Sequence, residues 1–219
     1  MYRMKKMFVL FLSALPFFAC TEKREEAKTA ADPKDAVIEN LLTRRSIRKY
    51  TANQVERGKI DTLMKCAIYA PSALNKQPWE VRVIRNKELL TDINNRFLAF
   101  AKGKKLSGSA SRAGEPGFSV FHSAPTLIVM AKDKNNTGAL LDIGLLSENV
   151  MLAAHALGLG TCPIGSVVPI FNDPANADLL KTINLDPAIH DVAIAIALGY
   201  PDETPPVKER FAERVKIIE

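Results

Sequence analysis

Two uninterrupted apolar runs constrain the fold of this chain more than any other feature of its sequence. TLIVMA at 126–131 and VAIAIAL at 192–198 contain no charged side chain, a pattern typical of strands that are buried on both faces. A third strand is predicted over Trp79–Arg85, where Val81 and Val83 alternate with polar residues. Helical patterns separate these strands at irregular intervals. The order of elements therefore favours an α+β domain over a regular series of parallel strands and helices.

The helices are predicted from the spacing of apolar residues. In the first, four aliphatic residues between 37 and 42 share one face, and Asp35 is a candidate N-cap. Pro71 ends the second helix, and Gly158 ends the long apolar fourth. The small-residue segment 103–117 is predicted to be a loop. The predicted helices are Asp35–Thr43, Gln54–Tyr69, Lys87–Ala101, Asp142–Leu157 and Asp173–Ile183.

The composition is that of one globular domain with a short appendage. The 219 residues are 47% hydrophobic and 25% charged, which argues against a disordered chain and a multi-pass membrane protein. Three cysteines cannot form a disulfide framework, and no cysteine or histidine pair has the spacing of metal ligands. The sequence has no arginine-rich tract. We therefore expect neither a metal nor a nucleic-acid partner.

The first 19 residues have the layout of a secretory signal peptide. Arg3, Lys5 and Lys6 precede an uncharged run at 7–19, which is shorter than the roughly 20 residues that a membrane-spanning helix needs. The alternative is a buried N-terminal helix. Since three of the 30 basic residues and none of the 24 acidic ones lie in this leader, its removal lowers the net charge from +6 to +3. That charge is too small to indicate a nucleic-acid partner.

Cys20 directly follows the predicted leader and resembles the lipidated cysteine of bacterial lipoproteins. The surrounding sequence resembles their lipobox, with Phe17 at the position where leucine is usual. Residues 20–34 are charged and poor in large apolar side chains, so they are predicted to be a tether before a domain at 35–219. We expect an exported protein of a bacterial cell envelope that contacts the membrane only through a lipid anchor.

Two basic stretches are candidates for phosphate binding. RRSIR at 44–48 places three guanidinium groups and a hydroxyl directly after a helix, where they could hold a phosphate through charge-assisted hydrogen bonds. Lys208 and Arg210 add two cations near the C-terminus. Taken alone, each stretch has a simpler interpretation, a solvated basic turn for the first and a solvated tail for the second.

Two further stretches suit a flat ligand. APSALNKQPW at 70–79 combines two prolines, small residues and two amides, so its constrained backbone could approach a ring closely. The alternative is an ordinary connector. GLGTCPIGS at 158–166 could direct successive backbone N–H groups at a polarised ring edge. Within it, Cys162 is expected to be a small buried residue without a redox role.

Together, and in this order, the four stretches resemble the nitroreductase family of FMN-dependent oxidoreductases. The resemblance rests on R-R-S-x-R, A-P-S-x-x-N-x-Q-P-W, L-G-L-G-T-x-P-I-G and K-x-R, and it covers roughly residues 38–215. It implies a mixed, mainly antiparallel sheet flanked by helices. It also implies a homodimer that binds FMN at the subunit interface.

The resemblance further implies which residues bind FMN. The basic stretch as a whole, Arg45 included, would bind the cofactor. Within it, Arg44 and Ser46 would contact the phosphate and the ribityl chain, and Arg48 would lie near the pyrimidine edge of the ring. Lys208 and Arg210 would complete the phosphate clamp. The other implied contacts are Pro163, Ile164, Gly165 and Ser166 beside the ring, and Pro71, Ser72, Ala73 and Asn75 from the partner subunit.

The implied chemistry belongs to the flavin, so no catalytic side chain is predicted. A donor, NAD(P)H in the family, would pass a hydride to flavin N5 and leave. A nitroaromatic, a quinone or a similar small acceptor would then take the electrons in ping-pong exchange. Because nicotinamide nucleotides are scarce outside the inner membrane, the predicted leader leaves the donor open. The 103–117 segment is a candidate lid over the ring.

Two alternatives to this function remain at the level of sequence. The first is an exported lipoprotein that binds a flavin or another flat ligand without turnover. The second is a flavin dehalogenase branch of the same family.

Overall fold

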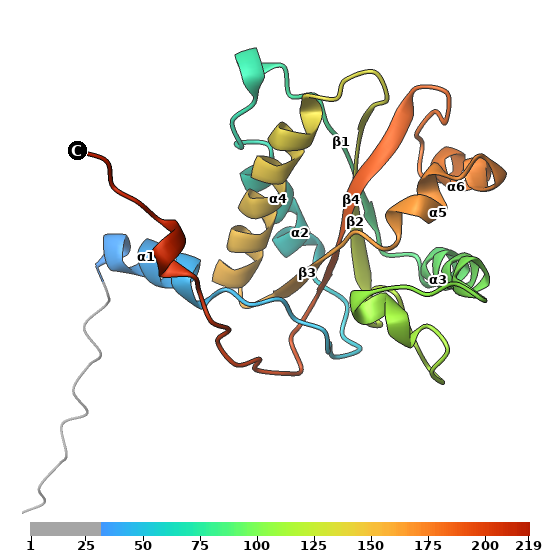
Figure 1. The fold of residues 1–219 in the computed structure, drawn as a ribbon, viewed down its shortest axis with the longest axis horizontal. Coiled ribbons are helices and arrows are strands. Elements are labelled where there is room, and N and C mark those ends of the chain that lie inside the picture. Colours follow the sequence, from blue (N-terminus) through green and yellow to red (C-terminus); the bar gives the residue numbers. More distant parts are fainter. Residues whose placement is uncertain (1–31) are drawn as a thin grey trace, which may run out of the picture. The chain divides into compact units, whose positions relative to one another are not determined.

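A computed structural model describes residues 32–219; the predicted leader, Cys20 and most of the predicted tether lie outside the described residues. Residues Pro33–Glu219 form one unit, in which a sheet is covered by helices on both faces (Figure 1). The predicted α+β architecture is confirmed. The boundary at residue 35 is close to the start of this unit.

The sheet has four strands in the order β1-β2-β4-β3, and each pair of neighbours is antiparallel. The two apolar runs of the sequence form the central strands, which explains why they are buried on both faces. The sheet of the described residues is thus antiparallel throughout and not mixed as expected, and the one parallel contact is an isolated bridge outside it, between Ser46 and Thr161. The strands are β1 (Glu80–Ile84), β2 (Thr126–Asp133), β3 (Gly160–Ile164) and β4 (His190–Gly199).

The alternation of side chains along β2 divides the core into two halves. Ile128 and Met130 pack under α2 (Arg57–Ala67) and α4 (Ala139–Ala156). Leu127 and Val129 point to the opposite face, because successive residues of a strand face opposite sides of the sheet. That second face is covered by α3 (Lys87–Ala101), α5 (Val168–Asn172) and α6 (Ala177–Thr182). The remaining helix, α1 (Pro33–Thr43), contacts α4.

Several details differ from the sequence-based predictions. Helix α2 is Arg57–Ala67 and not Gln54–Tyr69, and α4 begins at Ala139, before the predicted Asp142. Helix α1 begins at Pro33, so Asp35 lies in its first turn and is not its N-cap. The helix predicted at 173–183 is divided, because Asp173 caps a short 3₁₀ turn and α6 begins only after that turn. A separate short helix, α5, lies before Asp173. Strand β3 occupies a segment that the sequence indicates only as a turn. It contains Pro163, which is tolerated because β3 is an edge strand.

Candidate functional site

The basic segment 44–48 lies along the outer edge of β3. Its Ile47 backbone N–H donates to the carbonyl of Thr161 at 2.9 Å, next to the Ser46–Thr161 bridge. A few residues later, Tyr50 pairs with Pro201 directly after β4. The sheet therefore brings two of the four sequence stretches, 44–48 and 158–166, to one edge. The chain after Pro201, which leads to Lys208 and Arg210, starts at the same edge.

Gly160 makes this close approach possible. A Cβ atom built at Gly160 would lie 2.8 Å from Cγ1 and 2.9 Å from Cβ of Ile47, closer than such atoms approach in proteins. Because Ile47 is β-branched and buried, it has little freedom to move. We expect Gly160→Ala to destabilise the fold by about 1–3 kcal/mol through overpacking and to displace the basic segment. Chemical denaturation measures the loss in free energy of unfolding. Gly58→Ala is the control, because a Cβ atom at Gly58 would have no neighbouring atom within 4 Å.

A cavity of about 260 Å³ opens beside Arg44. Among the described residues, the Nη1 atom of Arg44 is buried and has no hydrogen-bond partner. Buried donors are normally satisfied, so an orphan guanidinium nitrogen at a cavity indicates a missing acceptor. The cavity is otherwise lined by the end of α1, by the last turn of α4, by Gly158–Thr161 and by the segment after β4. Its chemistry suits an anion such as a phosphate.

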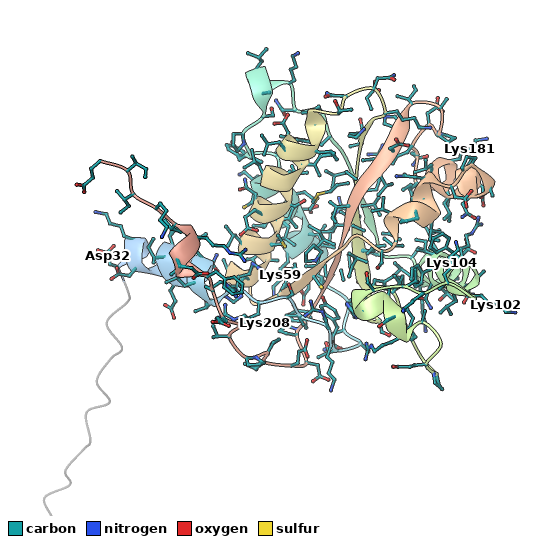
Figure 2. The ribbon with its side chains drawn as sticks, in the orientation of Figure 1. Asp32, Lys59, Lys102, Lys104, Lys181 and Lys208 are labelled. Atoms are coloured by element: carbon teal, nitrogen blue, oxygen red, sulfur yellow. The ribbon has the colours of Figure 1, made fainter. Side chains whose placement is uncertain are left out.

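The other predicted cationic ligands differ from Arg44 in their hydrogen-bond partners, although Arg45 lines the same cavity. Nη1 of Arg45 donates to the carbonyls of Leu42 at 2.7 Å and of Arg44 at 2.8 Å, so this guanidinium closes the C-terminal end of α1. Lys208 and Arg210 are exposed, and Figure 2 shows Lys208 in the C-terminal segment. Like Arg45, Arg210 donates through Nη1 to neighbouring backbone carbonyls, those of Lys208 at 2.9 Å and Glu209 at 3.2 Å. A phosphate role for the two C-terminal cations therefore stays a prediction.

Glu203 places a carboxylate against the basic segment. Its carboxylate accepts a hydrogen bond from the backbone N–H of Arg48, and it lines the same cavity as Arg44. No sequence motif marks this residue as part of the site. Its position follows from the pairing of the chain after β4 with residues 49–51.

A second cavity, of about 360 Å³, is lined by Arg48 and His122. Nε2 of His122 is buried and without a hydrogen-bond partner in the described part of the chain. Burial lowers the pKa of His122, and the positive charges of Arg48 and Arg112 lower it further, so the imidazole is neutral at pH 7. His122 and Ser123 have φ of 59° and 56°, a left-handed geometry that non-glycine residues seldom adopt. The sequence analysis missed His122 because its position depends on this turn.

The candidate lid borders this second cavity. The segment 103–117 is not wholly irregular, because it contains a short 3₁₀ helix (Gly108–Arg112) whose Ala110 is buried in the core. Its second half, including Arg112, Glu115 and Gly117, lines the cavity that also holds Arg48. This placement is compatible with a segment that borders a ligand, and its role as a lid stays a prediction.

The segment 163–166, with the sequence PIGS, continues from β3 into the turn before α5. Pro163 and Gly165 are exposed, whereas the side chain of Ile164 is buried in the core. Only the backbone of Ile164 is therefore available to a ligand. Cys162 is buried as expected, and burial raises the pKa of its thiol, which keeps the sulfur protonated.

The loop with Pro71, Ser72, Ala73 and Asn75 lies at the opposite end of the same protomer. The backbone N–H of Ala73 donates to Asp142 in the first turn of α4, at 3.2 Å. The basic segment instead follows Thr43, the last residue of α1, which is hydrogen-bonded to His155 in the last turn of α4. Thirteen residues of helix separate these two contacts, a span of about 20 Å. Within one protomer the two stretches cannot form one site, as the two ends of α4 in Figure 1 illustrate.

The same loop is exposed and held in an unusual backbone conformation. Leu74, Asn75 and Gln77 have φ of 53°, 53° and 46°, and Leu74 is 87% exposed. A hydrogen bond from the Gln77 backbone to the Ser72 hydroxyl, at 2.9 Å, fixes the turn. Strained, fixed backbone at an exposed position is typical of a segment that contacts another molecule.

No group of three potential metal ligands occurs among residues 32–219. The cations of the basic segment, the backbone at 163–166 and the exposed 71–75 loop instead suit a phosphorylated organic ligand. The sequence profile of the Nitroreductase family matches residues 41–200. The chain belongs to the nitroreductase family. An NADPH-flavin oxidoreductase from Vibrio harveyi is 30% identical over 190 residues, which cover 83% of this chain and 72% of that protein.

Solved nitroreductase structures resemble this one in fold. A nitroreductase with bound FMN from Desulfitobacterium hafniense has a TM-score of 0.77 and 26% identity, covering 84% of this chain and 98% of that chain. Another with bound FMN, from Bacteroides fragilis, has a TM-score of 0.74 and the same identity and coverage. The nitroreductase match ends before Lys208 and Arg210, so their roles stay predictions.

Proposed function

We propose that this chain is an FMN-dependent oxidoreductase that passes electrons from a reduced donor, NAD(P)H in the simplest case, to a nitroaromatic, quinone or similar small acceptor. The observation that carries the proposal is the buried guanidinium nitrogen of Arg44, which lies beside a cavity and has no partner within residues 32–219. Two nitroreductases of the same fold bind FMN. When bound, FMN supplies the hydride chemistry, and the protein supplies binding, orientation and electrostatics.

Each part of the site has a distinct task in this proposal. Arg44 and Ser46, assisted by the exposed Lys208 and Arg210, hold the phosphate and the ribityl chain through charge-assisted hydrogen bonds. Arg48 places a positive charge near the pyrimidine edge, where it stabilises negative charge on the ring. The backbone at 163–166, exposed at Pro163 and Gly165, would lie beside the ring.

The proposal includes a homodimer, because each protomer holds only part of the site. Leu140, Leu141 and Leu145 form an exposed apolar stripe on α4, opposite its buried face, and exposed apolar patches of this kind mark protein interfaces. By length and composition α4 could also cross a membrane, but its other face packs on the sheet. Further exposed apolar residues are Val37, Ile38, Leu41, Leu42, Val207, Phe211, Val215, Ile217 and Ile218.

Two α4 helices that pack antiparallel would place the N-terminal end of one beside the C-terminal end of the other. This arrangement brings Ser72 and Asn75 of the partner subunit to the basic segment of the first protomer. A two-fold axis repeats the contact and gives two equal sites.

The experiment that tests the function uses protein purified without residues 1–20. We expect a yellow protein whose released cofactor has the mass of FMN. Under anaerobic conditions NADH or NADPH should bleach it, and a nitroaromatic or a quinone should restore the colour. A flavin that stays oxidised with each donor would favour the alternative of a binding protein without turnover, and a colourless protein that binds no added FMN would contradict the proposal.

Export and lipidation belong to the proposal through the leader and Cys20. We expect the full chain, expressed in a bacterium, to incorporate labelled fatty acid, and Cys20→Ser to abolish the label. Label that persists in the variant would contradict lipidation at this cysteine. In an exported protein a membrane-bound or small-protein donor would replace NAD(P)H.

A further inference from the structure

His155, in the last turn of α4, lies at the Arg44 cavity with one ring nitrogen already engaged. Its Nε2 is 2.9 Å from Oγ1 of Thr43. The Thr43 hydroxyl donates its only hydrogen to the carbonyl of Glu39, at 2.6 Å, so Oγ1 must accept from an Nε2–H group. This bond fixes the tautomer and leaves Nδ1 without a proton in the neutral ring. The described residues provide no hydrogen-bond partner for Nδ1.

The surroundings of His155 favour a ligand that is negatively charged. The half-buried ring lines the cavity of about 260 Å³ together with Arg44 and Arg45. Burial lowers the pKa of His155, and the two arginines lower it further. Without an anion in the cavity, the neutral ring is therefore the stable form at pH 7. An anion would reverse this preference, because opposite charge favours the protonated form.

We propose that His155 is a phosphate ligand of the FMN site, with Nδ1–H donating to a phosphate oxygen while Nε2–H remains on Thr43. This inference rests on the proposed function, because it takes the ligand of the cavity to be FMN. It adds an imidazole to a clamp that otherwise consists of guanidinium, ammonium and hydroxyl groups. The affinity for FMN then depends on pH through one residue.

The direction of this dependence follows from the charges that face the ring. Arg44 and Arg45 from the basic segment oppose protonation, and Glu203 from the segment after β4 favours it. Helix α1, which packs on α4, carries Lys34, Asp35 and Glu39. A phosphate dianion raises the pKa of His155 in the complex above its value in the free protein. FMN binding therefore tightens as the pH falls through the range between these two pKa values. Protonation of the phosphate itself, near pH 6, acts in the opposite direction.

The test compares wild type with His155→Gln, because a glutamine amide can still donate to Thr43 but cannot become charged. The quenching of FMN fluorescence gives Kd between pH 8.5 and 5.5. We expect the ratio of the variant's Kd to the wild-type Kd to rise about tenfold over this range, the factor that corresponds to a pKa change of one unit. Riboflavin, which lacks the phosphate, should show no such rise.

His190→Gln is the matched control. His190 starts β4, its ring lies within hydrogen-bond distance of the Asp186 backbone carbonyl, and it does not line this cavity. A ratio for His155→Gln that stays constant with pH, or that rises equally for riboflavin, would overturn the inference while FMN binding itself persists. If wild type binds no FMN at any pH, the proposed function fails together with this inference.

Discussion

Arg44→Ala is expected to lose FMN. The wild-type guanidinium has a buried nitrogen with no acceptor among residues 32–219, so a bound phosphate would supply the missing partner. Charged hydrogen bonds of this kind contribute about 1.5–3 kcal/mol, which corresponds to a Kd weaker by about 10- to 100-fold. The flavin-to-protein ratio after dialysis, read from the absorbance spectrum, measures the effect.

Arg57→Ala is the matched control for this substitution. Arg57 is 79% exposed and pairs with Asp61 on the surface of α2, where a salt bridge contributes little to stability. The control should keep its flavin, and both variants should unfold at temperatures close to that of the wild-type apoprotein. An Arg44→Ala protein that retains stoichiometric FMN after dialysis would remove Arg44 from the site.

Leu141→Glu is expected to give a monomer that binds no FMN. Leu141 is 73% exposed on the apolar stripe of α4, and the proposed interface would bury it against the partner. An unpaired carboxylate there costs about 3–5 kcal/mol, enough to weaken dimerisation more than 100-fold. Light scattering coupled to size-exclusion chromatography gives the mass, and absorbance gives the flavin content of the same peak.

Ile189→Glu tests whether any exposed charge has the same effect. Ile189 is 47% exposed and does not belong to the apolar stripe of α4, since it lies directly before β4, so this variant should remain a yellow dimer. A Leu141→Glu protein that is still dimeric would exclude the α4 stripe from the interface. A monomer with normal flavin content would show that each protomer holds a complete site.

The sequence predicts those elements whose burial leaves a clear periodic pattern. The apolar runs became the central strands, and α3 has the predicted bounds of Lys87–Ala101. Strand β3 was missed because its glycine and proline residues have low strand propensity and its pairing with β4 is a long-range contact. The division of the helix at 173–183 was missed because Asp173 and Pro174 start a new turn within one apolar pattern.

The site is predictable only where its residues lie in short motifs. The four stretches identify the family, and RRSIR contains the one arginine with an orphan buried nitrogen within the described residues. The sequence does not separate Arg44 from Arg45, since the role of Arg45 at the end of α1 depends on local geometry. His122, His155 and Glu203 reach the site through turns and strand pairing, so no spacing along the chain connects them to it.

We expect each FMN site to combine the cations of one protomer with the 71–75 loop of the other, and mixed dimers can test this sharing. Ala73 is exposed, so Ala73→Trp should obstruct the site by bulk without disturbing the core. Homodimers of Arg44→Ala and of Ala73→Trp should both lose FMN. A mixed dimer isolated through two affinity tags should bind one FMN, because one of its two sites combines the unaltered parts of both chains. A mixed dimer that binds none would contradict the shared site.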